Sequence, residues 1–281
     1  MAGTSTNSDF SVNHAFLSGA NGGTLKDLGT LPGDTNSTGS DVNSSGQVTG
    51  GGDTHAFLSG ANGGALKDLG TLAGDAGSFG DGVNDAGQVT GVSGNSDFSV
   101  FHAFLSGANG GALKDLGTLP GDVSSEGNRV NNSGQVVGNS IDSNFVRHAF
   151  LSGANGGALE DLGTLPGDVG SDGYGINDAG QVVGNSYDNS HYSAFLFSNG
   201  VMTDLNSLIA PGSGFILSTA EGISNTGFIT GVGFDKGGQY SFLLTPMNAP
   251  VPEASTTISF GLLLALGLGG VVVAGKRKRK A

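Results

Sequence analysis

Histidine recurs at one position of a repeated sequence, and its side chain could ligate a metal or transfer a proton. The four copies begin at His14, His55, His102 and His148. A metal site needs several such ligands within about 2–2.5 Å of one ion. Ser193 and Tyr240 stand at this position in two later copies, so the repeat has no strict requirement for a ligand there. We therefore expect the histidines to have a structural role at the start of a strand.

Aspartate recurs in glycine-rich segments. One set is Asp34, Asp75, Asp122 and Asp168, and a second set is Asp27, Asp68, Asp115, Asp161 and Asp204. Calcium loops need several oxygen ligands at alternating positions. The nearest match runs from Asp168 to Asp172 and has the wrong spacing, whereas an aspartate in such a turn usually binds its own backbone. We expect solvated turns, no metal and no cofactor, with calcium at one or more loops as the alternative.

Signatures of catalysis are absent from the sequence. It contains no G-x-S-x-G elbow, no H-E-x-x-H and no G-x-x-x-x-G-K-[ST] phosphate loop. A Ser, His and Asp set drawn from the repeat would occur four times, which is unlike a single active site. We therefore expect that the protein is not an enzyme. The alternative is an enzyme whose active site lies at the mouth of a propeller.

The elements that position these residues come from the repeat, whose copies start 41 to 47 residues apart. In each copy, His-Ala-Phe-Leu and Leu-Lys-Asp-Leu-Gly flank a Gly-Ala-Asn-Gly-Gly turn, which predicts a β-hairpin. A second hairpin is predicted where Val-Asn and Gln-Val-Val-Gly flank Asp-Ala-Gly. Four short strands per repeat predict an all-β propeller of about five four-stranded blades, with a β-solenoid as the alternative. Blades this rich in glycine should stack to bury a core that includes Phe16, Leu17 and Leu28.

These motifs resemble the HAF-type extracellular repeat over roughly residues 8–245. The resemblance rests on His-Ala-Phe, on Asp-Leu-Gly-Thr-Leu-Pro-Gly-Asp and on Asn-Asp-Ala-Gly-Gln-Val-Val-Gly, which recur in order. It implies an extracellular location and no defined chemistry.

Composition restricts the partners of the body. Residues 1–250 contain 6 Lys and Arg against 23 Asp and Glu, a net charge of −17. This charge argues against nucleic-acid binding, which needs a positive surface. Cysteine is absent, so no disulfide or thiolate site is available. Residues 7–12 recur identically as residues 95–100, so we expect the chain to begin inside a repeat and a signal peptide to lie upstream.

The C-terminal segment has the composition of a membrane anchor. An uncharged apolar run over residues 258–274 predicts a transmembrane helix of roughly 25 Å. The basic cluster after it predicts a cytoplasmic tail and places the body outside the cytoplasm. This cluster consists of Lys276, Arg277, Lys278, Arg279 and Lys280.

The same segment resembles the PEP-CTERM sorting signal of bacterial envelope and exopolysaccharide-associated proteins. The motif residues are Val251, Pro252, Glu253, Ala254 and Ser255, and Ala254 stands where the family has a second proline. The resemblance implies that an exosortase-type membrane enzyme recognises Pro252 and Glu253 and cuts nearby. An unprocessed anchor and a buried core helix are the alternatives.

We thus predict a truncated repeat over 1–13, a repeat domain over 14–246, a linker over 247–257, the helix over 258–274 and the tail over 275–281. The predicted function is that of a non-enzymatic, exported envelope protein, held in the membrane before processing. Afterwards it would lie at the cell surface or among exopolysaccharide, which is a candidate partner. A glycan-binding propeller module is the alternative. Four Tyr and no Trp argue mildly against it, and Tyr187, Tyr192 and His191 form the cluster to test.

Overall fold

The computed structural model describes residues 1–7, 11–246, 261–266 and 270–276. The described chain is almost entirely β-structure and divides into two compact units, Met1–Asp161 and Leu162–Ala281. Every strand pair is antiparallel, and the strands form six small sheets. The prediction of an all-β repeat protein is confirmed.

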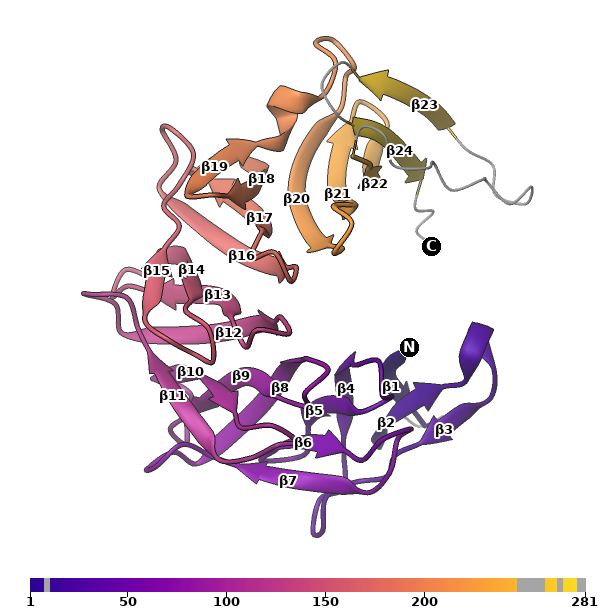
Figure 1. Ribbon diagram of the computed structural model, residues 1–281, viewed down its shortest axis with the longest axis vertical. Helices are drawn as coiled ribbons and strands as arrows, with labels where there is room; N and C mark the ends of the chain where they lie inside the picture. Colours follow the sequence, from indigo (N-terminus) through magenta and orange to yellow (C-terminus); the bar gives the residue numbers. More distant parts are fainter. Residues whose placement is uncertain (8–10, 247–260, 267–269, 277–281) are drawn as a thin grey trace. The chain divides into compact units, whose positions relative to one another are not determined.

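The first unit contains four of the six sheets (Figure 1). The first sheet has β1 (Ala2–Thr6), β2 (Asn13–Ser18) and β3 (Leu25–Asp27), with the 3₁₀ turn η1 (Ala20–Gly22) between the last two. The second has β4 (Thr38–Val42), β5 (Val48–Gly51), β6 (Ala56–Ser59) and β7 (Leu66–Gly70). The third has β8 (Gly77–Val83), β9 (Val89–Gly94), β10 (Phe101–Ser106) and β11 (Leu113–Gly117). The fourth has β12 (Ser124–Val130), β13 (Val136–Ile141), β14 (Arg147–Ser152) and β15 (Leu159–Asp161).

The second unit contains the other two sheets. The fifth sheet has β16 (Gly170–Ile176), β17 (Val182–Tyr187), β18 (Tyr192–Ser198) and β19 (Val201–Asp204). The 3₁₀ helix η2 (Leu205–Leu208) follows. The sixth has β20 (Ile216–Ile223), β21 (Ile229–Asp235), β22 (Gly238–Leu244), β24 (Gly270–Lys276) and β23 (Gly261–Leu266), in this order across the sheet.

Each four-stranded sheet consists of two hairpins, as the repeat predicts. The Asn-Gln hairpin comes first and the His-Ala-Phe hairpin second, so that the Gln-Val strand pairs with the His-Ala-Phe strand (β5 with β6, β9 with β10). We predicted about five blades, whereas the structure has six sheets. The excess arises because residues at both ends of the repeat region form strands: β1 pairs with β2, and the stub at Tyr240 lies in β22.

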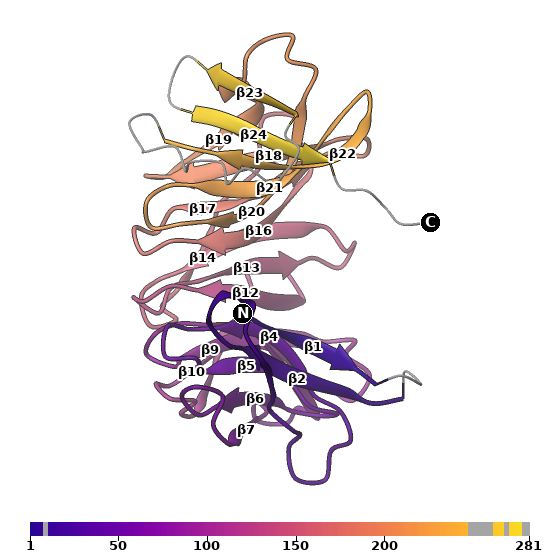
Figure 2. The same cartoon turned by 90° about the vertical axis from the view of Figure 1, so that its right-hand side faces the viewer.

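The core lies between neighbouring sheets within each unit, and both views show β1 and β2 beside β4 (Figures 1 and 2). Phe57, from the His-Ala-Phe motif, is fully buried and packs with Leu31 and Val48 in one cluster. Its equivalents in the next three sheets are also fully buried: Phe104, Phe150 and Phe195. Glycine allows the first two strands of a sheet to approach closely, because a Cβ at Gly91 would overlap the carbonyl oxygen of Phe79.

The predicted helix over 258–274 is not shown. Its described parts form β23 and β24, and β24 pairs with β22, from Tyr240 opposite Lys276 to Leu244 opposite Val272. A short apolar run cannot be assigned to helix or strand from periodicity alone. Here glycines interrupt the run, the valines of residues 271–273 favour a strand, and the edge of β22 supplies backbone partners. Among the described residues, no helix is long and apolar enough to cross a membrane.

Candidate functional site

Three of the four repeated histidines contact an aspartate of their own sheet within hydrogen-bonding distance. His14 Nδ1 lies 2.9 Å from Asp27 Oδ2, and the same pair recurs as His55 with Asp68 and His102 with Asp115, both at 3.0 Å. The hydrogen bond from His14 lowers the pKa of Asp27, and the Gly29 N–H contributes to the same shift. This contact joins the last two strands of a sheet, so the structure gives these histidines a structural partner.

His148 departs from this pattern. Its Nδ1 lies 3.4 Å from Asp122 Oδ2, an aspartate of the preceding Pro-Gly-Asp turn whose side chain is only 6% exposed. Asp34 also binds outside its own turn, because its Oδ2 accepts the Asp53 N–H at 3.0 Å. Asp34 and Asp122 therefore cross-link their turns to other parts of the chain, whereas we expected solvated turns. Across residues 1–7, 11–246 and the two short C-terminal strands, no group of three His, Asp or Glu is placed to hold a metal ion.

The fifth sheet replaces the histidine by Ser193, two residues before the buried Phe195. Asp204, the counterpart of Asp27, accepts hydrogen bonds from the backbone N–H of Asn206 at 2.8 Å and from its Nδ2 at 3.0 Å. Asn206 in turn accepts the Leu217 N–H at 2.8 Å and donates to the Leu217 carbonyl at 2.9 Å. The loop after β19 is thereby fixed to β20, and the small serine leaves space above Asp204.

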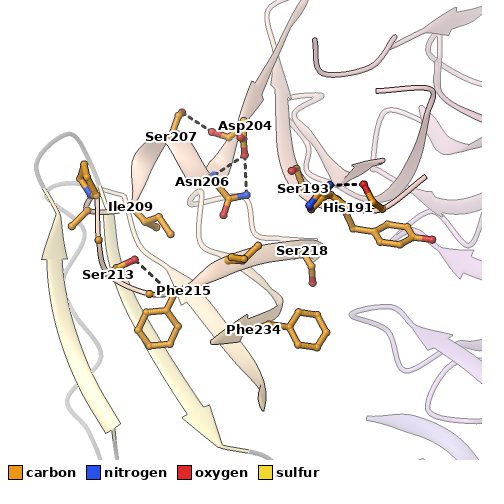
Figure 3. A pocket seen from close by; sticks show the side chains of 17 residues that line it. His191, Ser193, Asp204, Asn206, Ser207, Ile209, Ser213, Phe215, Ser218 and Phe234 are labelled. Carbon is orange, nitrogen blue, oxygen red and sulfur yellow. Dashed lines mark hydrogen bonds between the residues drawn. The ribbon is translucent and has the colours of Figure 1, made fainter. Parts of the chain in front are cut away.

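This space is part of a groove of about 790 Å³ in the second unit (Figure 3). One wall comes from the start of β18 and the residues before it, and the other from η2, the loop after it and the ends of β20 and β21. The lining residues are Ser190, His191, Tyr192, Ser193, Asp204, Asn206, Ser207, Ile209, Ala210, Pro211, Gly212, Ser213, Gly214, Phe215, Ile216, Ser218 and Phe234. No lysine or arginine is among these described lining residues.

Aromatic rings border the groove on both walls. Tyr192 is 54% exposed and packs on Tyr187 with ring centroids 5.5 Å apart. Phe234 is 45% exposed, and Phe215 packs edge-on against Tyr240 at 6.1 Å. The sequence drew attention to the two tyrosines at residues 187 and 192 and missed both phenylalanines. The sequence could have pointed to them, because residues 205–215 differ from the regular Leu-Gly-Thr-Leu-Pro-Gly-Asp segment.

Asp188, Ser190 and His191 form a compact turn beside the groove. Backbone N–H groups of Ser190 and His191 bind Asp188 Oδ1 at 2.7 Å each, and these contacts lower the pKa of Asp188 to about 2. The Ser190 hydroxyl donates to Asp188 at 3.0 Å and lies 2.8 Å from His191 Nδ1.

This turn does not have the arrangement of a catalytic triad. In a triad the histidine holds the serine on one ring nitrogen and the carboxylate on the other. Here the Ser190 hydroxyl and the Asp188 carboxylate both lie at Nδ1 of His191, and the serine hydroxyl donates to the carboxylate. The arrangement supplies a fixed anionic acceptor and an exposed imidazole, which suits binding of hydroxyl groups.

The predicted processing residues from Val251 to Ser255, and Arg277 to Lys280 of the basic cluster, lie outside the described residues. Lys276 is described only as the end of β24. The structure therefore brings Tyr187, Tyr192 and His191 together, as predicted, and leaves the processing motif untested.

No protein-family model matches the chain, and no curated protein does. Among solved structures, the chain is similar to TolB from Acinetobacter baumannii, with a TM-score of 0.55 and 12% identity over 98% of this chain. It spans 63% of the length of that TolB. A protein assigned as TolB from Agrobacterium tumefaciens has a TM-score of 0.47 at 15% identity, covering 80% of this chain and 84% of its own. A gluconolactonase from Xanthomonas campestris has a TM-score of 0.39 at 12% identity, covering 84% of this chain and 85% of its own. The first likeness supports a β-propeller-like fold.

Proposed function

We propose that this protein is a non-enzymatic binding module of the bacterial cell envelope whose groove in the second unit holds a neutral glycan. The observation that carries the proposal is the groove itself, with exposed rings on two walls and fixed polar groups between them. Ring faces pack on the apolar faces of sugars, and a few convergent polar groups orient a ligand in such a site.

The charge of the groove favours a neutral ligand over an acidic one. Its lining has Asp204 and neither lysine nor arginine, and Asp188 beside it stays ionised because its pKa is about 2. A uronic acid or sulfated sugar would meet these carboxylates without a lysine or arginine to compensate them. Hydroxyl-rich neutral sugars, or sugars with a free amine, can donate to the same carboxylates.

Binding to an array of neutral and acidic glycans, measured with and without a chelator, tests the proposal. We expect wild-type protein to bind neutral glycans and Tyr192→Ala to bind them at least about tenfold more weakly, equivalent to 1.4 kcal/mol. Phe145→Ala is the matched control, because Phe145 is 86% exposed and lies in the first unit. Equal binding by the three proteins, or none by wild type, would reject the groove as the site. Loss of binding on chelation alone would instead support the calcium alternative.

The envelope location is the second part of the proposal and rests on the C-terminal sequence. Pro252 and Glu253, followed by an apolar run and five basic residues, support delivery through an exosortase-type enzyme and contact with exopolysaccharide. The intact mass of the protein recovered from its native envelope and medium tests this part. We expect a C-terminus near Pro252 and Glu253, whereas a full-length mass in the membrane fraction would indicate an unprocessed anchor.

A further inference from the structure

Three regular sheets show what the aspartate of the last strand binds when the histidine of the repeat is present. In the first, second and third sheets, a histidine ring nitrogen lies 2.9 to 3.0 Å from Oδ2 of this aspartate. The pairs are His14 with Asp27, His55 with Asp68 and His102 with Asp115. An ionised carboxylate only accepts hydrogen bonds, so the nitrogen is the donor. Each of these three sheets therefore has a position for one N–H donor beside the carboxylate.

The fifth sheet keeps the aspartate and the strand register but lacks this donor. Asp204 lies opposite Phe195, as Asp68 lies opposite Phe57 in the second sheet. Ser193 stands two residues before Phe195, where the regular sheets have the histidine. Ser193 and Asp204 both line the groove of the second unit. The space that an imidazole fills in the regular sheets is therefore part of this groove.

Asp204 has one oxygen engaged by the protein and one available to a ligand. Its Oδ1 accepts the Asn206 backbone N–H at 2.8 Å and the Asn206 Nδ2 at 3.0 Å (Figure 3). Within the part of the chain that the structure describes, no hydrogen bond reaches its Oδ2. Asp204 is nevertheless half-buried, whereas its counterparts Asp27, Asp68 and Asp115 are exposed. Its carboxylate is thus held in one orientation and partly shielded from water, which strengthens a charge-assisted hydrogen bond.

The surroundings of this oxygen favour a positively charged donor over a neutral one. The described lining of the groove contains neither lysine nor arginine, and residues 1–250 have a net charge of −17, so a cation is attracted to the body. The exposed rings of Tyr192 and Phe234 border the same groove, and aromatic ring faces attract ammonium groups. A hydroxyl group can also donate to Asp204, but a donor without charge forms a weaker bond.

We infer that the groove binds a sugar with an unsubstituted amino group, whose ammonium takes the place of the missing histidine at Asp204 Oδ2. The inference rests on the proposed function and narrows it to glycans that contain a free amino sugar. An N-acetyl group would replace the ammonium by a larger, uncharged amide. A hydroxyl group at the same carbon would keep the size of the donor and remove its charge.

Three oligosaccharides that differ only at C2 of each sugar test the inference. They are the β-1,4-linked trimers of glucosamine, N-acetylglucosamine and glucose, titrated calorimetrically into the full-length protein at neutral pH. We expect the glucosamine trimer to bind at least about tenfold more tightly than the other two, because hydrogen bonds between charged groups are stronger than neutral ones. Equal affinities, or binding of other glycans alone, would overturn the inference while glycan binding stands. Failure of every glycan, on the array and in the titration, would reject the proposed function as well.

Two aspartate variants separate this site from the overall charge of the body. Asp204→Asn keeps an oxygen that can accept from Asn206 and replaces Oδ2 by a donor, so the preference for the amine should disappear. Asp68→Asn removes the same charge where His55 already occupies the position, and it should keep the preference. Ser193→His supplies the imidazole itself and should also remove the preference, which provides a second test if Asp204→Asn does not fold. A preference that survives Asp204→Asn and Ser193→His, or that falls equally in Asp68→Asn, would overturn the inference.

Discussion

The regular sheets of the first unit and the fifth sheet of the second unit share one sequence pattern but differ in what they leave exposed. In three of the four sheets of the first unit a histidine pairs with the aspartate of the last strand, as in His55 with Asp68. In the fifth sheet Ser193 takes the place of the histidine, Asp204 binds Asn206, and a longer loop follows. The groove lies where the sequence departs from the repeat. The repeated residues thus form the scaffold, and the residues that differ from the repeat form the candidate site.

The core of the regular sheets should be the most sensitive part of the molecule. Phe104 is fully buried in a cluster with Leu58, Val83 and Val89, so Phe104→Ala should lower the free energy of unfolding by about 3–5 kcal/mol. Phe234→Ala, at a ring that is 45% exposed in the groove, should cost about 0.5 kcal/mol or less. Denaturant titration of both variants measures the contrast. Similar losses would mean that the groove is as tightly packed as the core.

Substitution of the asparagine in the Asn-Gln hairpin should have the next largest effect on the free energy of unfolding. Asn84 Oδ1 accepts the N–H groups of Ala86 and Gln88, and its Nδ2 donates to the Gln88 side chain and to the Asn131 carbonyl, at 2.8 to 3.1 Å. Asn84→Ala should cost about 2–4 kcal/mol of unfolding free energy, because it leaves buried partners unpaired. The side chain of Ser224, its irregular counterpart in the second unit, accepts the Phe228 N–H and lies 3.0 Å from the Thr226 hydroxyl. Ser224→Ala should cost about 0.5–1.5 kcal/mol by the same titration.

A bulge interrupts the pairing of the first two strands in the second to sixth sheets, and its residue in the third sheet should make stability depend on pH. Asp81 occupies it in the third sheet, where burial raises its pKa to about 7 against an attraction from Arg129. The unfolded chain releases this proton near pH 3.9, so the folded chain holds more protons between about pH 4 and 7 and stability falls as pH rises through that window.

Asp81→Asn should therefore raise the free energy of unfolding by about 1–3 kcal/mol at pH 8 relative to wild type and have little effect below pH 4. Denaturant midpoints across this pH range measure the difference. Asp97→Asn serves as the control, because hydrogen bonds from Ser99 lower the pKa of Asp97 and its titration falls below the window. An Asp81→Asn variant with an unchanged pH slope would show that Asp81 is ionised in the fold.

A substitution with a small expected effect on stability gives the sharpest test of the candidate site. Ser193→His restores the repeat residue and should pair with Asp204, closing the groove and weakening glycan binding by about tenfold or more. Unfolding free energy should change by about 1 kcal/mol or less, as for the reverse exchange His102→Ser at a partly exposed pair. Glycan titration and denaturation of both variants are the measurements. Undiminished binding by Ser193→His would place the ligand elsewhere.

Local sequence determined the elements of the body. The Asn-Gly and Asp-Ala-Gly turns fix where each hairpin bends, since only a few residue types accept the positive φ found at Asn62 and Gly87. The burial of consecutive alanine, phenylalanine and leucine in His-Ala-Phe-Leu, as at Ala56, Phe57 and Leu58, likewise recurs with the repeat. Such short-range signals recur several times in this chain, so that each copy supports the others. The apolar run over 258–274 lacked this support, and the structure shows strands in its described part and does not show the predicted helix.

Only the tertiary structure decided which side chains meet. His148 and Asp122 are 26 residues apart and join because the turn before β12 lies against the start of β14, whereas the Lys26 contact to Asn62 joins two neighbouring sheets. The groove combines residues before β18 with the loop after η2 and the ends of β20 and β21. Periodicity and turn chemistry act over a few residues, whereas these contacts depend on the tertiary packing of the chain. The sequence by itself thus determined the strands and turns, and packing determined the candidate site.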